Sequence, residues 1–496
     1  MQNFHIYESV FLYVFWLVLI VEITQFYIKT TTMKRIFSLK TIVIFFTLLG
    51  GKIAFSQLPS QTISDSLQSI LDRSLRTDFQ NSGAVLSVYV PGKWTWSSAT
   101  GKGIAGITSG QNLTTASPTE NFRVGSITKM MMATCILKLQ ESGLLNIEDP
   151  ISNYLRPTLL NDTIHSSAVV KIRHLLNHTS GIANSGDNTT CQMDVLNNPL
   201  NPHTLEDAVY CGASQGELFS PEFAWAYSNT NYSLLAMIIN NVSGMNYRDY
   251  LNQIIFQPLN LTHTYIPTSN QLPTTHLGCY WNIGTWIDLT IVNPTTYSGW
   301  ADVVSSTEDL IQFYSALRNG TIINSNSFTL MKTMFPGTLD YGLGYDHYVF
   351  SGVNYDGHYG EVANTSGLFF ANTTSDAAPN GYYIAYNFNT QGADMINKID
   401  LPVFNLLNSA STNGIAEKAI SIINVFPNPV KDMLSIENFE GEILNIKLLN
   451  SVGQDVEITY SLNSKIQIDC STFESGIYIV EIQSKNGITK KKINIQ

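Results

Sequence analysis

The amino-terminal part of the chain shows the hydrophobic pattern of a helix, a β-hairpin and a second helix. Apolar residues recur at helical spacing over 61–76, which predicts the first helix. Residues 85–90 predict a strand, and a Pro-Gly turn leads to a return strand that starts at 93–96. Residues 127–140 are rich in Met, Leu and Ile and predict the second helix, which should end before Gly143.

The following region predicts more helices and one more pair of strands. Within an Asn-, Thr- and Ser-rich stretch, helices are expected at 230–242 and 305–318. Strands follow at 366–371 and 382–387, and a last helix at 393–408. The order helix, hairpin, helices, hairpin, helix predicts an α+β fold: an antiparallel β-sheet flanked by helices, with an all-helical insertion between the hairpins.

A different pattern begins after residue 408. Small polar residues over 409–422 predict a linker. Short strands then return at short spacing, at 434–436, 443–449, 456–460, 466–468, 477–482 and 490–495. This spacing predicts a small C-terminal β-sandwich over 423–496.

The amino terminus carries two apolar stretches. Residues 33–56 have the order of a secretory signal peptide, with a positive start, an apolar centre and a cleavage site at Ala54-Phe55-Ser56. The earlier stretch at 10–21 is shorter than the roughly 20 residues that a membrane span needs. We therefore expect translation to begin at Met33, with residues 1–32 a wrongly assigned extension and no stable membrane span in the mature protein. A real amino-terminal anchor is the alternative.

Composition narrows the class of protein. The chain has 496 residues, of which 44% are apolar and 13% charged, enough for a large core in two or three domains. The formal net charge of -11 argues against nucleic-acid binding. None of the five cysteines forms a Cys-x-x-Cys pair, and we expect no metal and no cofactor. A disulfide between Cys191 and Cys211, which lie in a loop-like region, stays open.

Ser126 and Lys129 form the first chemical motif. They are three residues apart at the start of a predicted helix, so their side chains should share one helix face. A buried lysine has a lowered pKa and can take the proton of a serine hydroxyl. The helix amino terminus adds partial positive charge where an oxyanion would form. Taken alone, a surface Ser and Lys on an ordinary helix is the alternative.

Two further motifs follow in order along the chain. Tyr227 and Asn229 offer a proton-transfer group and an amide that can bind substrate. His358 and Gly360 precede the last strand pair, and the glycine lets the backbone approach a ligand closely. Taken alone, each of these motifs is better explained as an ordinary turn, the first with a helix cap and the second with an exposed histidine.

Together the motifs resemble the serine β-lactamase-related family, which includes class C β-lactamases, D-Ala-D-Ala carboxypeptidases, D-aminopeptidases and some esterases. The resemblance extends over about 62–408, and we assign 57–408 to this domain. The runs that carry it are FRVGSITK at 122–129, LQESGLLNIEDP at 139–150, IRHLLNHTSGI at 172–182, YSN at 227–229, SSTEDL at 305–310 and YGLGY at 341–345.

The resemblance implies the catalytic roles. Ser126 would be the acylated nucleophile, and Lys129 and Tyr227 would share the base and acid roles. The backbone N–H groups of Ser126 and Glu361 would form the oxyanion hole. His178 would belong to a structural loop beneath the site.

It also implies the substrate-binding residues, which are Asn229, His358, Gly360 and Glu361. Asn229 would bind the substrate amide, and His358 would support the site electrostatically.

Two departures from the usual family pattern matter, one in the third motif and one in the residues that follow it. His-Tyr-Gly at 358–360 replaces Lys-Thr-Gly, which is closer to carboxypeptidases than to true β-lactamases. Tyr359 is bulky and is expected to narrow the pocket. Glu361 would disfavour an anionic substrate if its side chain points inward. Asn364 is expected to take the left-handed backbone of the turn that follows.

Residues 423–496 resemble a type A sorting domain of the type IX secretion system. The runs that carry this second resemblance are VFPNPV at 425–430, LSI at 434–436, GIY at 476–478 and KKK at 490–492. It implies export to the medium or to the outer-membrane surface, with the secretion machinery as partner. An ordinary carbohydrate-binding-like sandwich is the alternative.

These features predict a secreted serine hydrolase that acts through a Ser126 acyl-enzyme on amide or ester substrates. D-Ala-type peptides and β-lactams rank first. The alternatives are an esterase of the same family and a non-catalytic peptidoglycan-binding protein.

Overall fold

The computed structural model describes residues 57–495, apart from 109–111, 158, 160–163, 165–167, 273–274, 335–339, 409–422, 439–442, 451–454, 461–464 and 485–486. The predicted signal peptide, the extension before it and the linker at 409–422 lie outside the described residues. The described residues fall into two compact units, which divide between residues 411 and 412. No helix of the described residues is long and apolar enough to cross a membrane.

A six-stranded antiparallel sheet brings the two ends of the first unit together. Its order is β2-β1-β10-β9-β8-β7, so the first hairpin pairs directly with the last strand. The strands are β1 Gly83–Val90, β2 Trp94–Gly101, β7 Asp346–Phe350, β8 Val353–Glu361, β9 Thr365–Ala371 and β10 Tyr382–Phe388. The predicted antiparallel sheet is confirmed, with β7 and β8 as strands that the sequence did not predict.

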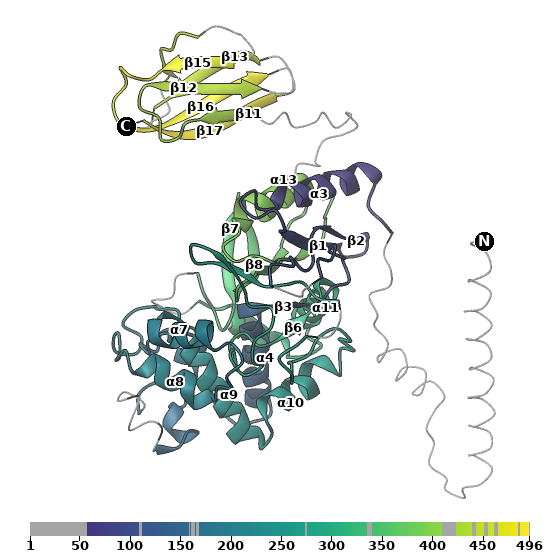
Figure 1. Ribbon diagram of the computed structural model, residues 1–496, viewed down its shortest axis with the longest axis vertical. Helices are drawn as coiled ribbons and strands as arrows, with labels where there is room; N and C mark the ends of the chain where they lie inside the picture. The colour runs from purple at the N-terminus through teal and green to yellow at the C-terminus, as the bar shows by residue number, and fades with distance from the viewer. Residues whose placement is uncertain are drawn as a thin grey trace, which may run out of the picture. The chain divides into compact units, whose positions relative to one another are not determined.

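The central strands β1, β9 and β10 are buried on both faces of the sheet, and most of their residues are apolar. Along β1, Val85 points into one core, and Leu86 and Val88 point into the core on the opposite face. Helices from the two chain ends cover that second face (Figure 1). They are α3 Gln61–Ser74, the π-helical turn η5 Ile396–Asp400 and α13 Leu401–Asn408.

The other face carries a mainly helical region. Its elements are the turns η1 Gly125–Ile127, η2 Ile151–Asn153, η3 Ser185–Asp187 and η4 Asn252–Phe256, and the helices α4 Thr128–Glu141, α6 Ile172–Leu176, α7 Thr189–Asn197, α8 Leu205–Ala213, α9 Asn229–Ser243, α10 Tyr247–Leu251, α11 Thr307–Arg318 and α12 Ser325–Lys332. Two short ladders join it, β3 Phe122–Arg123 with β6 Val304–Ser305 and β4 Tyr280–Asn282 with β5 Trp286–Asp288. The predicted helices α4, α9 and α11 are confirmed.

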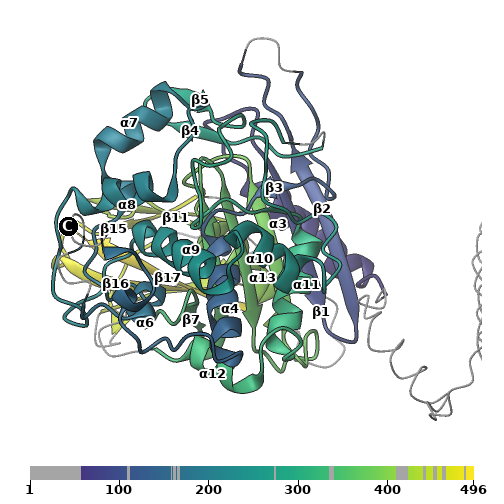
Figure 2. The same cartoon turned by 90° about the horizontal axis from the view of Figure 1, so that it is seen from below.

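Helix α4 is the centre of this region. It is apolar on nearly all sides and packs against α9 (Figure 2), as expected of a helix with no solvent-facing side. Gly143, just past its end, has a positive φ of 69°, which confirms the predicted stop. Burial of this helix fixes the first motif, which lies at its amino terminus.

The second unit is the predicted C-terminal sandwich. Its two sheets have the orders β11-β12-β15 and β14-β13-β16-β17 and share one apolar core. The strands are β11 Ile423–Phe426, β12 Met433–Asn438, β13 Ile443–Leu449, β14 Asp455–Val456, β15 Lys465–Asp469, β16 Gly476–Ser484 and β17 Gly487–Ile495. The predicted strand at 456–460 is wrong in extent, because β14 covers only Asp455–Val456. The Tyr460 hydroxyl accepts the Ile446 N–H of β13 at 2.7 Å.

A buried carboxylate joins the last helical segment to the sheet. Asp400 is fully buried, and three tyrosine hydroxyls donate to it, from Tyr355 and Tyr359 at 2.6 Å and from Tyr386 at 2.9 Å. Burial raises the pKa of Asp400 to about 6, although the three hydrogen bonds oppose the shift. Ionisation of Asp400 therefore costs stability in the folded state.

Asp400→Asn should change how stability depends on pH. Because the folded pKa lies above the unfolded value of 3.8, the folded state holds an extra proton between about pH 4 and 6, and stability falls as pH rises through that window. The free energy of unfolding in urea, as the difference wild type minus Asp400→Asn, should fall by up to about 3 kcal/mol from pH 4 to 7. Asp72→Asn, at an exposed position of α3, is the matched control. If the free energy of unfolding of wild type and Asp400→Asn changed equally with pH, the assignment to Asp400 would be contradicted.

Candidate active site

Ser126 lies in the tight turn that leads into α4. Gly125 before it has a φ of 57°, and a Cβ atom there would lie 2.5 Å from the Glu361 nitrogen. Only glycine combines this left-handed backbone with so close an approach. The turn therefore presses the backbone of Ser126 against β8, which is more than 200 residues away in sequence.

Lys129 is completely buried and its amino group meets three oxygen atoms. Its Nζ lies 2.9 Å from Ser126 Oγ, 2.8 Å from Asn229 Oδ1 and 3.1 Å from the Trp300 carbonyl oxygen. Burial holds the pKa of Lys129 well below its usual value, although Asp346 opposes the shift. A neutral amine in this position can keep two of these bonds and accept the Ser126 proton.

Tyr227 closes the group from the segment before α9. Its hydroxyl hydrogen-bonds with Ser126, and its ring lies 4.9 Å from Lys129 Nζ. Burial raises the pKa of Tyr227 far above its usual range, so the side chain is a phenol at neutral pH. It can donate a proton but is a poor base.

His178 lies beneath Tyr227, as the sequence indicated. The two rings are 4.3 Å apart, and His178 Nδ1 accepts the Ser228 N–H at 3.1 Å. Burial holds the pKa of His178 well below 6.5, which keeps the ring a neutral acceptor. Its contacts are with the backbone and ring of the second motif rather than with Ser126.

Asn229 starts α9 and faces Lys129. Its Oδ1 accepts from Lys129, and its backbone N–H donates to Asn184 Oδ1 at 2.9 Å. With the oxygen occupied, the amide nitrogen of Asn229 is the remaining polar group of the side chain, a hydrogen-bond donor.

His358 and Gly360 lie on the face of β8 that is turned toward the helical region. His358 is buried, with Nε2 2.8 Å from the Tyr341 hydroxyl and Nδ1 against the Tyr359 carbonyl oxygen. Burial lowers the pKa of His358, so its imidazole is neutral at pH 7. A Cβ atom at Gly360 would lie 2.0 Å from the Val124 carbonyl oxygen, which explains the glycine.

The edge of β8 is open next to Ser126. Pairing with β7 ends at Asp346 opposite Gly357, and the Tyr359 N–H points past that end to Asp346 Oδ2 at 3.5 Å. Because backbone groups alternate along a strand, the Glu361 N–H faces the same open edge. The Glu361 side chain instead accepts the Gly392 N–H through Oε1 at 2.7 Å.

One sequence expectation is wrong, and the one for Tyr359 stays a prediction. The left-handed residue of the turn after β8 is Ala363, with a φ of 60°, and not Asn364. Asn364 instead donates from Nδ2 to the Arg123 carbonyl oxygen at 2.7 Å. Tyr359 lines the cavity, but its hydroxyl is bound to Asp400 and its ring packs on Phe369, on the side of the terminal helices. Tyr359 therefore acts as a wall of the cavity rather than projecting toward Ser126.

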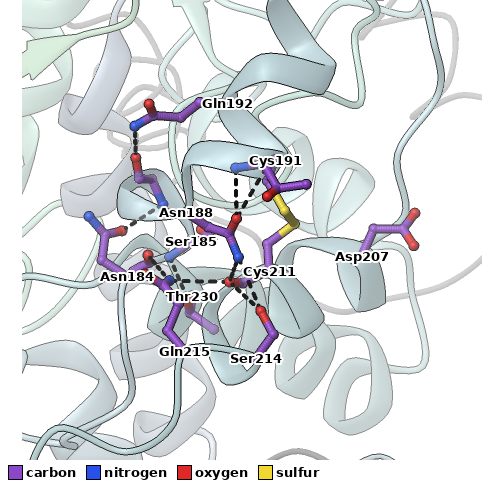
Figure 3. Close-up of a disulfide and its surroundings, with 12 residues drawn as sticks. Asn184, Ser185, Asn188, Cys191, Gln192, Asp207, Cys211, Ser214, Gln215 and Thr230 are labelled. Carbon is purple, nitrogen blue, oxygen red and sulfur yellow. Dashed lines mark hydrogen bonds between the residues drawn. A yellow bond between two sulfur atoms is a disulfide. The ribbon is translucent and has the colours of Figure 1, made fainter.

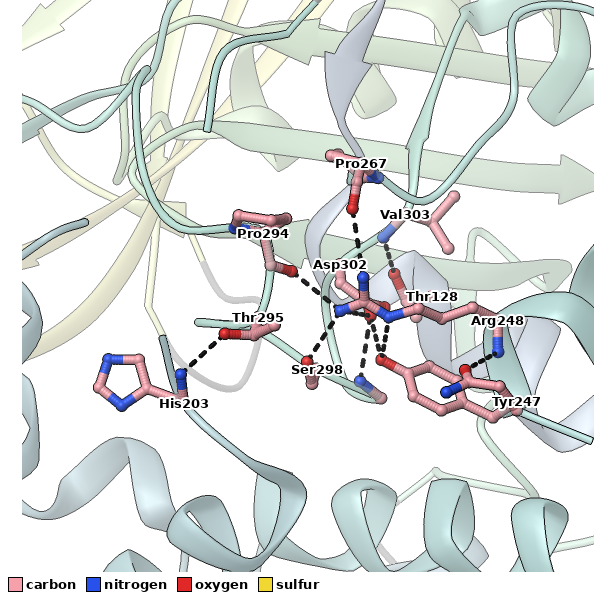
Figure 4. Close-up of polar contacts among 12 residues, drawn as sticks. Thr128, His203, Tyr247, Arg248, Pro267, Pro294, Thr295, Ser298, Asp302 and Val303 are labelled. Carbon is pink, nitrogen blue, oxygen red and sulfur yellow. Dashed lines mark hydrogen bonds and ion pairs between the residues drawn. The ribbon is translucent and has the colours of Figure 1, made fainter. Parts of the chain in front are cut away.

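Sequence reasoning missed the segment that supplies the third oxygen to Lys129. Residues 298–303 are held by Arg248, which donates to the Pro267 and Pro294 carbonyls at 3.2 and 3.1 Å and to Ser298 Oγ at 3.0 Å (Figure 4). The Tyr247 hydroxyl donates to buried Asp302 at 2.6 Å. No motif in the sequence indicates these contacts, because they run through backbone carbonyls and one buried ion pair.

A disulfide forms part of the cavity wall opposite Ser126. Cys191 of α7 is bonded to Cys211 of α8, and Asn188 Nδ2 donates to the Cys211 carbonyl at 2.9 Å (Figure 3). None of the α7 residues is fully buried, so the disulfide and the hydrogen bond from Asn188 to the Cys211 carbonyl hold α7 in place. The cavity that it borders has a volume of about 1050 Å³ and reaches Ser126, Tyr227, Asn229 and His358.

No group of three or more His, Cys, Asp or Glu side chains among the described residues could hold a metal ion. The arrangement around Ser126 is instead that of a nucleophile with a buried amine, a phenol and an open strand edge. These are groups of the kind that serine acyl transfer requires.

Comparison with known families agrees with this class of site. The family model described as Beta-lactamase matches residues 71–401, and the one described as Secretion system C-terminal sorting domain matches 424–496. The chain belongs to the β-lactamase family and ends in a sorting domain of the type IX secretion system.

Curated relatives match over part of their length. The putative penicillin-binding protein PbpX of Bacillus subtilis is 30% identical over 270 residues, which are 52% of this chain and 64% of that protein. Penicillin-binding protein 4* of Bacillus subtilis is 30% identical over 241 residues, 45% of this chain and 51% of that protein. The chain thus spans less than two thirds of either relative.

Solved structures share the fold over nearly their whole length. A D-stereospecific amidohydrolase from Streptomyces has a TM-score of 0.60 and 26% identity and covers 70% of this chain and 99% of its own. A D-amino acid amidase from Ochrobactrum anthropi in complex with L-phenylalanine amide has a TM-score of 0.59 and 22% identity, over 71% of this chain and 100% of its own.

Arg248→Met should weaken the site without touching the nucleophile. The variant keeps the aliphatic stem but removes the donors that fix residues 298–303, so it should lose about 2–4 kcal/mol of stability. Because the Trp300 carbonyl then loosens, kcat for p-nitrophenyl acetate should fall more than KM changes. Arg156→Met, which removes an exposed partner of Glu206, is the matched control. Unchanged kcat in folded Arg248→Met would show that this segment does not position Lys129.

Proposed function

We propose that this protein is an exported serine hydrolase that forms an acyl-enzyme on Ser126 with amide or ester substrates. The observation that carries the proposal is the fully buried Lys129, whose Nζ lies 2.9 Å from Ser126 Oγ. Burying a charged lysine that has no carboxylate in hydrogen-bond contact costs considerable free energy. That cost is smallest when the lysine is a neutral amine beside a hydroxyl.

The directions of the two pKa shifts favour Lys129 as the base. Neutral Lys129 takes the Ser126 proton as Oγ attacks the substrate carbonyl, and the carbonyl oxygen becomes an oxyanion. The N–H groups of Ser126 and Glu361 would stabilise that oxyanion at the open edge of β8. Tyr227, a phenol, would pass its proton to the leaving group and recover one from Lys129. Water then releases the acyl group by the reverse proton path.

Asn229 and His358 would hold the substrate and the site. The Asn229 amide nitrogen would donate to the carbonyl of the acyl part. His358, neutral and bonded to Tyr341, would support the β8 edge beside Gly360 rather than supply a positive charge.

For the substrate class we propose amides of D-amino acids, a class that includes D-Ala peptides, with β-lactams and esters as related substrates. The names of a D-stereospecific amidohydrolase and of two penicillin-binding proteins among the relatives support this choice. The non-catalytic alternative is disfavoured because a binding protein has no need of a buried lysine against a serine hydroxyl.

The sorting domain indicates export. We propose that the hydrolase acts outside the outer membrane, either attached to the cell surface or released, and that the tail has no part in catalysis.

Covalent labelling of the exported chain tests the proposal. Intact mass after incubation with p-nitrophenyl acetate or a fluorescent penicillin should show one adduct on the wild type and none on Ser126→Ala. Ser142→Ala, at the other end of the same helix, should label like the wild type. An adduct that survives Ser126→Ala, or no adduct on folded wild type with either probe, would refute the acyl-enzyme.

A further inference from the structure

The cavity at Ser126 has a one-sided charge. Five carboxylates line it, and none of its described lining residues is a lysine or an arginine. They are Asp187, Asp194, Asp207, Asp346 and Glu361. A cavity lined by charges of one sign raises the local concentration of ligands of the opposite sign.

These carboxylates are held by neutral donors. Asp187 and Asp194 accept from the Asn184 and Asn198 side chains at 3.1 and 2.9 Å, and Asp207 accepts the Thr204 N–H at 2.7 Å. Glu361 accepts the Gly392 N–H. No described lysine or arginine lies within ion-pair distance of any of the five, and Lys129 acts on Asp346 only at longer range.

Asp346 lies nearest to the chemistry. It is the first residue of β7 and lies at the open edge of β8, with its side chain 17% exposed. Its contacts there are long, 3.5 Å to the Tyr359 nitrogen and 3.7 Å to His358 Nδ1. His358 is neutral, and Lys129 is a base only when it is neutral. A carboxylate beside the nucleophile therefore has no firm cationic partner.

We propose that Asp346 binds an ammonium group of the substrate, so that the protein prefers amides with a free amino group close to the carbonyl that Ser126 attacks. Amino acid amides and peptides with a free amino terminus have this chemistry. The inference rests on the proposed acyl-enzyme and narrows its substrate class.

The same charge works against anionic substrates. A substrate ammonium would complete a charge-assisted pair with Asp346, whereas a carboxylate in the same place would face Asp346 and Glu361 together. Peptides recognised through a C-terminal carboxylate, and penicillins, which carry one, should therefore be the poorer substrates.

Three matched substrates separate this preference from the acyl-enzyme itself. They are the p-nitroanilides of D-phenylalanine, N-acetyl-D-phenylalanine and N-succinyl-D-phenylalanine, which are cationic, neutral and anionic at about pH 6.5, below the usual α-amino pKa. We expect kcat/KM to fall in that order, by about tenfold or more between the first and the last, and the gap to shrink as salt is added.

Asp346→Asn assigns the preference to one residue. The ratio of kcat/KM for the free-amine substrate to that for the N-acetyl substrate should fall by about tenfold. Asp72→Asn removes the same charge from α3, outside the cavity lining, and should leave the ratio unchanged.

The outcomes divide the two claims. A ratio that is unchanged in Asp346→Asn, or faster turnover of the N-succinyl substrate, overturns the role of Asp346 while labelling of Ser126 still stands. Loss of labelling at Ser126 in the wild type overturns both claims. An equal loss of kcat/KM for all three substrates in Asp346→Asn would show that Asp346 is a counter-ion of Lys129 and does not bind the substrate ammonium.

Discussion

The site depends on one unfavourable burial, that of the Lys129 amino group. A side chain that normally stays in water lies completely inside the protein, among the rings of Tyr227, Tyr232 and Trp300. Three oxygen acceptors from three separate segments make this possible. Because each acceptor must be in place, the positions of α4, of α9 and of residues 298–303 are coupled to one another. The free energy gained by burying the large apolar core around α4 offsets the cost of burying the Lys129 amino group.

The sheet solves the second problem, which is to bring a strand edge to the nucleophile. β8 comes from the last third of the unit and Ser126 from the first, and glycines at 125 and 360 let the two backbones touch. The antiparallel order places β8 between β9 and β7, and β7 begins only opposite Gly357. Asp346 is the first residue of β7, which puts a carboxylate next to the open edge of β8. The proposed oxyanion edge and the proposed ammonium site therefore lie at the same end of β7.

Much of this could be predicted from local patterns. Ser126 and Lys129 are three residues apart at the start of a buried helix, so helical spacing places both side chains on one face. Tyr227 and Asn229 lie at the start of another helix. Gly143, α9 and α11 follow from turn chemistry and periodicity. The resemblance to the serine β-lactamase-related family predicts that the three motifs come together in one site.

Other parts depend on tertiary contacts that no local pattern carries. β8 contains Asn354, Asp356, Gly357 and Gly360, which all disfavour strands, and it forms because β7 and β9 pair with it on both sides. The Arg248 contacts run to backbone carbonyls of distant segments. The left-handed residue of the turn after β8 is Ala363, and the Asn364 side chain bonds the Arg123 carbonyl oxygen, a tertiary contact that the sequence does not indicate.

The pH dependence of Ser126 acylation tests the central claim most directly. The rate constant for acylation by a neutral ester, corrected with Ser126→Ala, should rise with pH and reach a plateau, because only neutral Lys129 accepts the proton. We expect a midpoint well below the usual lysine pKa of about 10.4, and we expect Tyr227→Phe to lower the plateau without moving that midpoint. A rate that keeps rising to the ordinary lysine pKa would mean that Lys129 is a permanent cation, and the proposed base would be wrong.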